Sequence, residues 1–243
     1  MEKDNHPPHS YYPILMAGFV TVLLCSNLIG PAKVCQIEIP FHIPLIGTIL
    51  IFGAGNIFFP LSYIFGDILT EVYGYAKARK VIWVGFAAMI FATVMVQIII
   101  FLPPDNTESF NSTLQPALVT VFGTTWRVVI GSIIAFWVGD FINAYIMAKL
   151  KILTRGRHLW TRTITSTFFG QAADSLIFYP VAFYGIWDTE TLIYVILFNF
   201  VFKVFVEVLM TPATYIVVNR LKKSEKADHY DNQTNFNPFS FAD

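Results

Sequence analysis

The chain has 243 residues, of which 55% are hydrophobic and only 13% are charged, and its formal net charge is zero. This composition is far from that of a soluble domain, and the lack of a basic excess argues against a nucleic-acid partner. Several apolar runs reach the roughly 20 residues that cross a bilayer. The sequence therefore predicts an all-α, polytopic membrane protein with one compact domain.

Hydropathy predicts six membrane-spanning helices within a transmembrane domain that covers residues 11–223. Residues 1–10 lack the basic start and cleavage pattern of a signal peptide, so we expect a cytoplasmic leader followed by a retained first span. The second span is the least regular, because it contains Gly53, Gly55 and Pro60. In chain order, the predicted spans are residues 13–30, 43–64, 81–102, 126–150, 163–186 and 190–218.

The distribution of Lys and Arg sets the orientation of these spans. The chain has 16 such residues, and only Lys33 and Arg127 fall in segments that are extracytoplasmic if the N-terminus is inside. Lys203 lies within a span, and all the others lie in cytoplasmic segments, as the positive-inside rule requires. Both termini are therefore predicted to be cytoplasmic. The polar tail, residues 224–243, is expected to be disordered.

The sixth span carries polar residues at four-residue intervals, Asn199, Lys203, Glu207 and Thr211, which places them on one face of a helix. A Lys or Glu at hydrocarbon depth costs about 2.5–3.5 kcal/mol unless it faces a partner or a polar cavity. Counting the helical rise along the span puts Lys203 near the middle of the membrane and Glu207 closer to the cytoplasm. The stripe predicts a sheltered polar site. An ion pair between Lys203 and Glu207 within their own helix is the alternative interpretation.

Polar residues also interrupt the second, fourth and fifth spans. In and just after the second span, Asn56, Asp67 and Glu71 are interpreted as gating or structural residues, and a position at the water interface is the alternative interpretation of the last two. Asp174 is predicted at the same depth as Lys203, so we expect one central cavity lined by spans four to six. Structural hydrogen bonds between helices are the alternative role for several of these groups. The candidate substrate-binding residues are Asp140, Asn143, Gln171, Asp174, Asn199, Lys203 and Glu207.

The candidate residues offer a mixed set of hydrogen-bonding groups. Carboxylates and amides accept N–H groups, whereas Lys203 and the amides donate to carbonyl or ring-nitrogen acceptors. Such a set suits a flat polar heterocycle better than a bare ion or a lipid, and a guanine-like edge would present adjacent N–H donors to one carboxylate. Cys25 and Cys35 lack the spacing of a metal or redox motif, so no metal or cofactor is expected. The chain has no Walker motif and no arrangement typical of an intramembrane enzyme.

Residues 59–74, FPLSYIFGDILTEVYG, closely resemble the signature of the queuosine-precursor transporter family. The resemblance covers about residues 11–223, and weaker patterns support it: Arg127…Gly131-Ser132…Asp140…Asn143, Gly170-Gln171…Asp174-Ser175, and Lys203…Glu207…Thr211-Pro212. It implies a six-helix protein of the bacterial inner membrane that is related to vitamin-uptake substrate-binding subunits. It also implies import of 7-cyano-7-deazaguanine or 7-aminomethyl-7-deazaguanine, precursors of the tRNA base queuosine.

On this hypothesis the partners are the small-molecule 7-deazaguanine and membrane lipid, and homo-oligomer formation stays open. Glu207 would accept N–H groups of the 7-deazaguanine edge, with Lys203 holding it ionised, and Asp174 or Asp140 would take a further N–H or the aminomethyl cation. The amides of Asn143, Gln171 and Asn199 would complete the edge contacts. A substrate-binding subunit of an energy-coupling-factor transporter is the nearest alternative, and an intramembrane enzyme or scaffold is the second.

Overall fold

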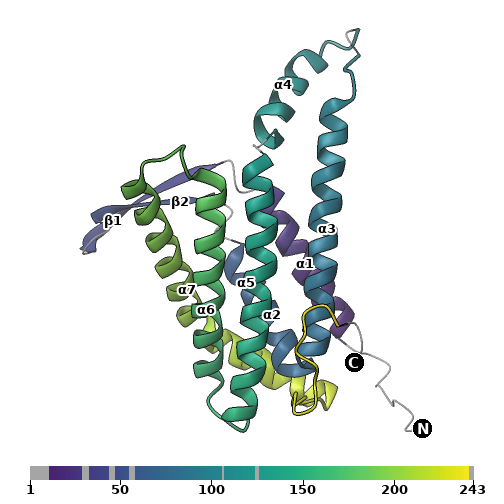
Figure 1. Ribbon diagram of the computed structural model, residues 1–243, viewed down its shortest axis with the longest axis vertical. Coiled ribbons are helices and arrows are strands. Elements are labelled where there is room, and N and C mark those ends of the chain that lie inside the picture. The colour runs from purple at the N-terminus through teal and green to yellow at the C-terminus, as the bar shows by residue number, and fades with distance from the viewer. Residues whose placement is uncertain are drawn as a thin grey trace.

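The structure is a computed structural model, and it describes residues 11–28, 33–43, 47–54, 58–105, 107–123 and 126–240. It is predominantly helical, as predicted, with one small antiparallel sheet (Figure 1). In chain order the elements are α1 (Tyr12–Leu28), β1 (Val34–Ile43), β2 (Gly47–Gly53), α2 (Phe59–Tyr73), α3 (Tyr75–Phe101), α4 (Asn111–Phe122), α5 (Trp126–Leu153), α6 (Leu159–Phe183) and α7 (Thr189–Glu225).

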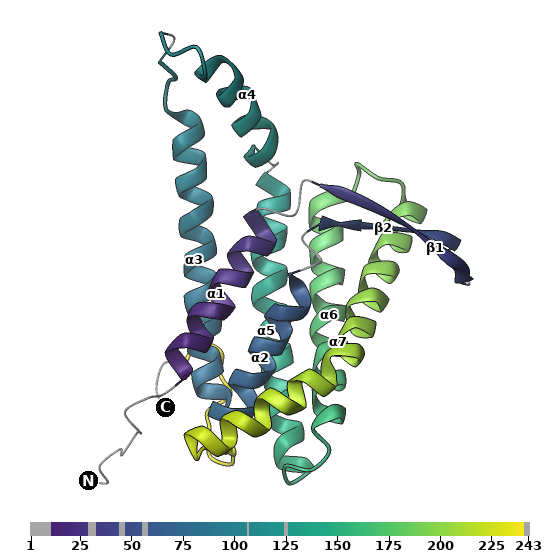
Figure 2. The ribbon, with the colours of Figure 1, turned by 180° about the vertical axis from the view of Figure 1, so that it is seen from behind.

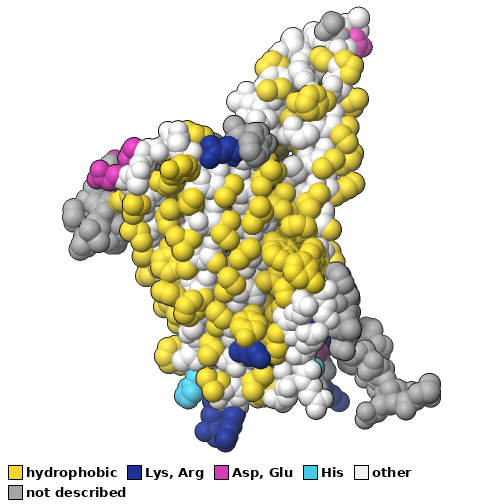
Figure 3. All heavy atoms as spheres, viewed as in Figure 1, with side chains coloured by type: hydrophobic (Ala, Val, Ile, Leu, Met, Phe, Trp, Pro, Cys, Tyr) yellow, Lys and Arg dark blue, Asp and Glu magenta, His cyan; other side chains and the backbone are white. Residues whose placement is uncertain are grey.

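The apolar character of the helices fits a membrane protein. Among the described residues, α3, α5 and α7 are long and apolar enough to cross a bilayer, and α1 is a shorter apolar helix. Hydrophobic side chains cover most of the face seen in Figure 3, whereas Lys, Arg and His side chains gather at its lower end. We call this hydrophobic face the apolar flank, and it is suited to contact with lipid.

The second predicted span is wrong in its first half. Residues Val34–Ile43 and Gly47–Gly53 form an antiparallel hairpin, in register from Val34 opposite Gly53 to Glu38 opposite Ile49. This segment is rich in Ile and other residues that favour strands. Helix α2 begins only at Phe59, with Pro60 in its first turn, where a missing N–H costs nothing. The hairpin lies across the ends of α6 and α7 (Figures 1 and 2).

Helices α5 and α6 pack against each other at very close range. A Cβ atom added to Gly170 would lie 2.9 Å from the carbonyl oxygen of Gly139, and one added to Gly139 would lie 3.1 Å from that of Gly170. Neither residue can therefore carry a side chain without a shift of the backbones. The crossing brings the polar residues next to these glycines, Asn143 and Asp174, to the interface between the helices.

Helix α7 contacts both α6 and α2 because it bends along its length (Figure 2). Pro212 lies inside the helix, where it removes one backbone hydrogen bond and favours a kink. One half runs beside α6, and the other half crosses below α2. Polar residues on the two halves of α7 can thus contact different helices.

The C-terminal tail, here residues 226–240, is ordered rather than disordered. The carboxylate of Asp231 accepts the backbone N–H of Tyr75 at 3.0 and 3.1 Å, which caps the start of α3. Arg79 donates to the backbone carbonyls of Asn235 and Asn237, at 2.7 and 3.0 Å. The polar composition concealed these buried contacts, and α7 itself continues past the predicted end of its span.

The beginning of α1 and the end of α7 lie at the same end of the molecule. The backbone N–H of Tyr11 donates to the Glu225 carboxylate. The tail also packs at this end, against α3 (Figure 1). Both ends of the helical domain therefore lie at the same end of the molecule.

Candidate functional site

An ion pair joins α6 to α7 inside the bundle. The Lys203 Nζ atom donates to Asp174 Oδ2 at 2.7 Å, and the two side chains are 6% and 19% exposed. The sequence left open a pair between Lys203 and Glu207 of the same helix, but the ion pair observed for Lys203 runs to the neighbouring helix instead. A desolvated pair of this kind fixes the two helices in register.

Glu207 is a buried carboxylate with unused hydrogen-bonding capacity. Its side chain is 1% exposed, and neither Oε1 nor Oε2 has a hydrogen-bond partner among the described residues. The rest of the polar stripe is buried too: Thr211 donates to the backbone carbonyl of Glu207, and Asn199 donates to that of Val195. Buried carboxylate oxygens normally have donors. Glu207 is therefore the most conspicuous candidate for a ligand contact.

Asp67 of α2 faces the same region from the opposite helix. It is fully buried, its Oδ1 accepts the Asn143 amide at 2.9 Å, and its Oδ2 has no partner among the described residues. The carboxylate interacts electrostatically with Glu207, Glu71 and Asp140. The structure therefore brings α2 into a site for which the sequence had proposed only spans four to six.

Tyr63 is a site residue that the sequence analysis missed. Its side chain is buried and lies close enough to Gln171, Asp174, Asp140 and Glu207 to interact with them electrostatically. Hydropathy counts Tyr as apolar, which is why it did not stand out. Its position four residues before Asp67, on the same helical face, is the signal that could have found it.

We call these residues the central cluster. It draws on α2, α5, α6 and α7, and it holds more carboxylates than cations. Its members are Tyr63, Asp67, Asp140, Asn143, Gln171, Asp174, Lys203 and Glu207. Asn199 is buried nearby on α7, and Asn56 lies outside the described residues.

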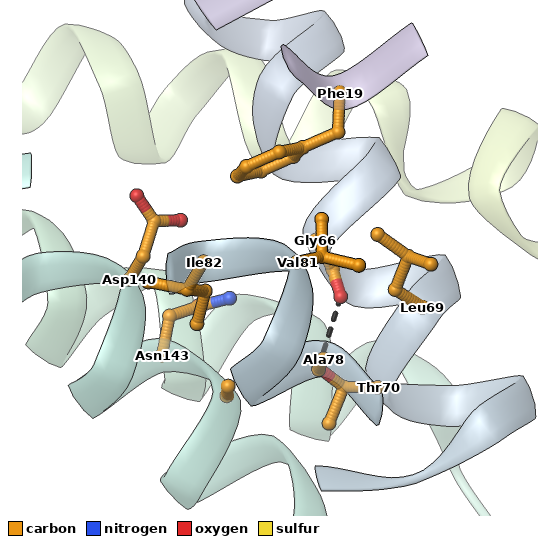
Figure 4. Close-up of a pocket in the computed structure, with 10 residues that line it drawn as sticks. Phe19, Gly66, Leu69, Thr70, Ala78, Val81, Ile82, Asp140 and Asn143 are labelled. Atoms are coloured by element: carbon orange, nitrogen blue, oxygen red, sulfur yellow. Dashed lines mark hydrogen bonds between the residues drawn. The ribbon is translucent and has the colours of Figure 1, made fainter. Parts of the chain in front are cut away.

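A small cavity adjoins the central cluster (Figure 4). Asp140 and Asn143 of α5 line it opposite Gly66 of α2, and Phe19 of α1 covers it. Its volume of about 10 Å³ holds roughly one water molecule. Pockets for small organic ligands measure about 300–1,000 Å³, so a bicyclic heterocycle needs the helices around this cavity to move apart.

A second charged group closes the end of the molecule where the termini lie. The Glu71 carboxylate, one helical turn beyond Asp67, receives Arg162 at 2.9 and 3.2 Å and Lys222 at 2.6 Å. Lys151 lies 3.6 Å from the same carboxylate and donates to the backbone carbonyl of Glu71. The cations come from α5, α6 and α7, so Glu71 ties three helices to α2.

Asp228 of the C-terminal tail completes this charged group. It accepts Lys151 at 2.6 Å and pairs with Lys222 at 2.8 Å. Partial burial opposes ionisation, but the hydrogen bonds from Lys151 and Lys222 outweigh it and lower the pKa of Asp228 below its usual value. Among the described residues, no group of three or more His, Cys, Asp or Glu side chains could hold a metal ion.

Comparison with known proteins identifies the family. Residues 53–217 match the model of the family described as "Putative vitamin uptake transporter". No solved structure matches the chain.

Three curated relatives share most of the chain. A "Probable queuosine precursor transporter" of Bacillus subtilis (strain 168) is 29% identical over 82% of this chain and 85% of its own length. A protein of the same name from Haemophilus influenzae is 28% identical, over 75% and 79% of the two chains. The "Queuosine precursor transporter" of Escherichia coli (strain K12) is 25% identical, over 70% and 74%. These matches confirm the resemblance seen in the signature segment, and the chain belongs to the vitamin uptake transporter family of membrane proteins.

Proposed function

We propose that this protein imports queuosine precursors, 7-cyano-7-deazaguanine or 7-aminomethyl-7-deazaguanine, across the bacterial inner membrane for tRNA modification. The names of the three relatives support the substrate class. The observation that carries the proposal is the buried Glu207 carboxylate, neither of whose oxygens has a hydrogen-bond partner in the described part of the chain, in a cluster that also holds amides and a lysine. That arrangement suits a flat heterocycle with adjacent N–H donors.

In this proposal Glu207 accepts two N–H groups of the 7-deazaguanine edge. Gln171 and Asn143 supply amide groups to the remaining edge positions, with Asn199 available further along α7. Lys203 is held by Asp174 and donates to the ring carbonyl, while Asp140 or Asp174 accepts a further N–H or the aminomethyl cation. Tyr63 offers an aromatic face beside Gln171. The small cavity beside Asp140 requires that binding accompany a separation of the helices.

The proposed topology has both termini in the cytoplasm. Six helices would cross the membrane, α1, α2, α3, α5, α6 and α7, and the hairpin would lie outside the hydrocarbon core. The excess of Lys and Arg near the end where α1 begins and α7 ends supports this orientation. Lipid covers the apolar flank, and the protein would work without a partner ATPase.

Uptake of labelled precursor tests the proposal. A bacterial strain unable to make 7-deazaguanines should take up the precursor when it expresses this chain, and Glu207→Gln or Lys203→Ala should reduce the uptake at least tenfold. Losing a hydrogen bond to a charged group costs about 1.5–3 kcal/mol, which corresponds to such a factor. Glu190→Gln is the matched control, since Glu190 is exposed at the start of α7 and should leave uptake unchanged.

Two outcomes would contradict this reading. Full uptake by both site variants, at equal protein levels, would remove Glu207 and Lys203 from the site. Uptake that appears in cells but never in liposomes containing this chain alone would favour the energy-coupling-factor subunit instead.

A further inference from the structure

The central cluster has more negative than positive charge. Four carboxylates belong to it, those of Asp67, Asp140, Asp174 and Glu207, and Lys203 is its one cation among the described residues. The ammonium group pairs with Asp174. An ionised carboxylate that is buried without a cation or enough donors is so unfavourable that it binds a proton instead. At least one of the remaining carboxylates therefore needs a proton.

Asp67 is the carboxylate with the strongest requirement. Its side chain is fully buried, and Asn143 of α5 donates to Oδ1 while Oδ2 has no donor among the described residues. The charges that act on it are negative from each side: Glu207 on α7, Asp140 on α5 and Glu71 on its own helix.

Nearby cations do not neutralise Asp67. Arg162 and Lys222 bind Glu71, one turn further along α2, and Lys203 binds Asp174. Asp67 Oδ2 thus lacks a hydrogen-bond donor among the described residues. Either a bound proton or a molecule that supplies one donor would stabilise it. The neighbouring cavity, which Asn143 also lines, has room for roughly one water molecule.

We propose that Asp67 binds one proton on Oδ2 and that this proton is carried inward together with the substrate. This coupling rests on the proposed function, because it requires that Glu207 bind the substrate. Asp67 then has the separate task of binding the proton. Substrate N–H groups stabilise the ionised form of Glu207, and an ionised Glu207 in turn favours the protonated form of Asp67. Each ligand therefore strengthens the binding of the other, as linkage requires, and the pair moves as a proton symport.

Infrared spectroscopy of the purified full-length protein in lipid tests the proton without any substrate. We expect a carbonyl stretching band of a protonated carboxyl group at neutral pH, lost in Asp67→Asn and retained in Asp228→Asn, whose carboxylate is ion-paired and partly exposed. Asn143→Ala removes the donor to Oδ1 and should move the titration midpoint of the band to higher pH. A neutral-pH spectrum without the band, or a band that neither Asp67→Asn nor Asn143→Ala alters, would overturn the assignment.

Proteoliposomes separate the coupling from the proposed function. The probe is labelled 7-cyano-7-deazaguanine, which is neutral, so each symport cycle carries the single positive charge of the proton. A potassium ionophore with equal potassium on both sides holds the membrane potential at zero, which leaves the pH difference as the driving force. With the outside one pH unit more acidic, a one-to-one symport drives up to about tenfold accumulation, because one pH unit corresponds to 1.36 kcal/mol. Exchange of the probe without accumulation would refute the coupling and leave the proposed function intact. Absence of both would refute the proposed function, while the infrared band still decides whether Asp67 holds a proton.

Discussion

Glu71 is fully buried. Cations from two helices donate hydrogen bonds to its carboxylate, and a third cation, Lys151, lies 3.6 Å from it. Arg162 contacts both carboxylate oxygens, Lys222 contacts one, and Lys151 lies slightly further away. A buried ion pair adds little net stability, but removing one partner leaves the others as uncompensated buried charges. The Glu71 carboxylate therefore matters for stability chiefly through the cations that depend on it.

We expect Glu71→Gln to lower the free energy of unfolding by about 3–5 kcal/mol, the usual cost of breaking a buried ion pair. Thermal or denaturant unfolding of the purified protein in detergent measures this change. Glu190→Gln serves again as the control, because an exposed helix-terminal carboxylate contributes at most about 1 kcal/mol. A Glu71→Gln protein as stable as the control would show that the charged group is not a structural element.

Spacing alone placed Asp67 and Glu71 on one face of a helix, but it did not reveal their partners. Arg162 and Lys222 are 91 and 151 residues away from Glu71 in the sequence. From the sequence, Arg162 and Lys222 indicate only the orientation of the spans. Likewise, depth predicted Lys203 and Asp174 at one level, whereas the choice of Asp174 over Glu207 as the partner of Lys203 required knowing which helices are neighbours.

At the scale of the elements, the crossing of α5 and α6 sets the geometry of the central cluster. The two helices meet backbone to backbone at Gly139 and Gly170. Small residues at such crossings are common in membrane helices, since they allow close packing. Any widening here displaces Asn143 from Asp67, and Asp174 from Lys203.

Gly170→Ala should lower the free energy of unfolding by about 1–3 kcal/mol, because the new methyl group overpacks a contact of 2.9 Å with a backbone oxygen. The same unfolding experiment measures the effect. Gly66→Ala on α2 is the matched control: a Cβ there meets nothing closer than 4.0 Å, and Ala favours a helix by up to about 1 kcal/mol. Equal stability of the two variants would contradict the close crossing.

Most helices could be predicted from the sequence, because long apolar runs leave few alternatives. The second span failed for a physical reason. Residues 43–53 are apolar apart from Thr48, and a short apolar run fits a strand as well as part of a helix. Only their pairing with Val34–Ile43 decides the matter, and that pairing depends on a chain reversal that hydropathy does not register.

At the scale of the whole molecule, the C-terminal tail fastens helices that are distant in sequence. Phe236 packs against Tyr75 of α3 and Tyr145 of α5, and Trp83 donates to the backbone carbonyl of Pro238. Composition predicted disorder because the tail is mostly polar. A few aromatic rings and one buried carboxylate, Asp231, were enough to bind it to the helices.

Ending the chain after Lys226 should destabilise the protein by about 2–5 kcal/mol, through loss of the α3 cap and of the buried aromatic contacts. The unfolding midpoint in detergent and the rate of limited proteolysis both measure this loss. Ending the chain after Ser240 is the control, since it preserves every described tail contact. If the two truncated proteins unfold alike, the tail contributes nothing to stability.

The packed tail also bears on how the orientation of the protein can be established. Reporter enzymes and fluorescent proteins are commonly fused to the end of a membrane protein in order to learn which side that end occupies. Here a fusion joined before Phe239 would remove the ring contacts of Phe239 with Trp83 and Trp137. One joined before Asn237 would also remove the hydrogen bond from Arg79 to the Asn237 carbonyl, and either would report on a damaged protein. A flexible linker placed after Ser240 keeps the native surface intact, so the reporter reads the topology of the folded transporter.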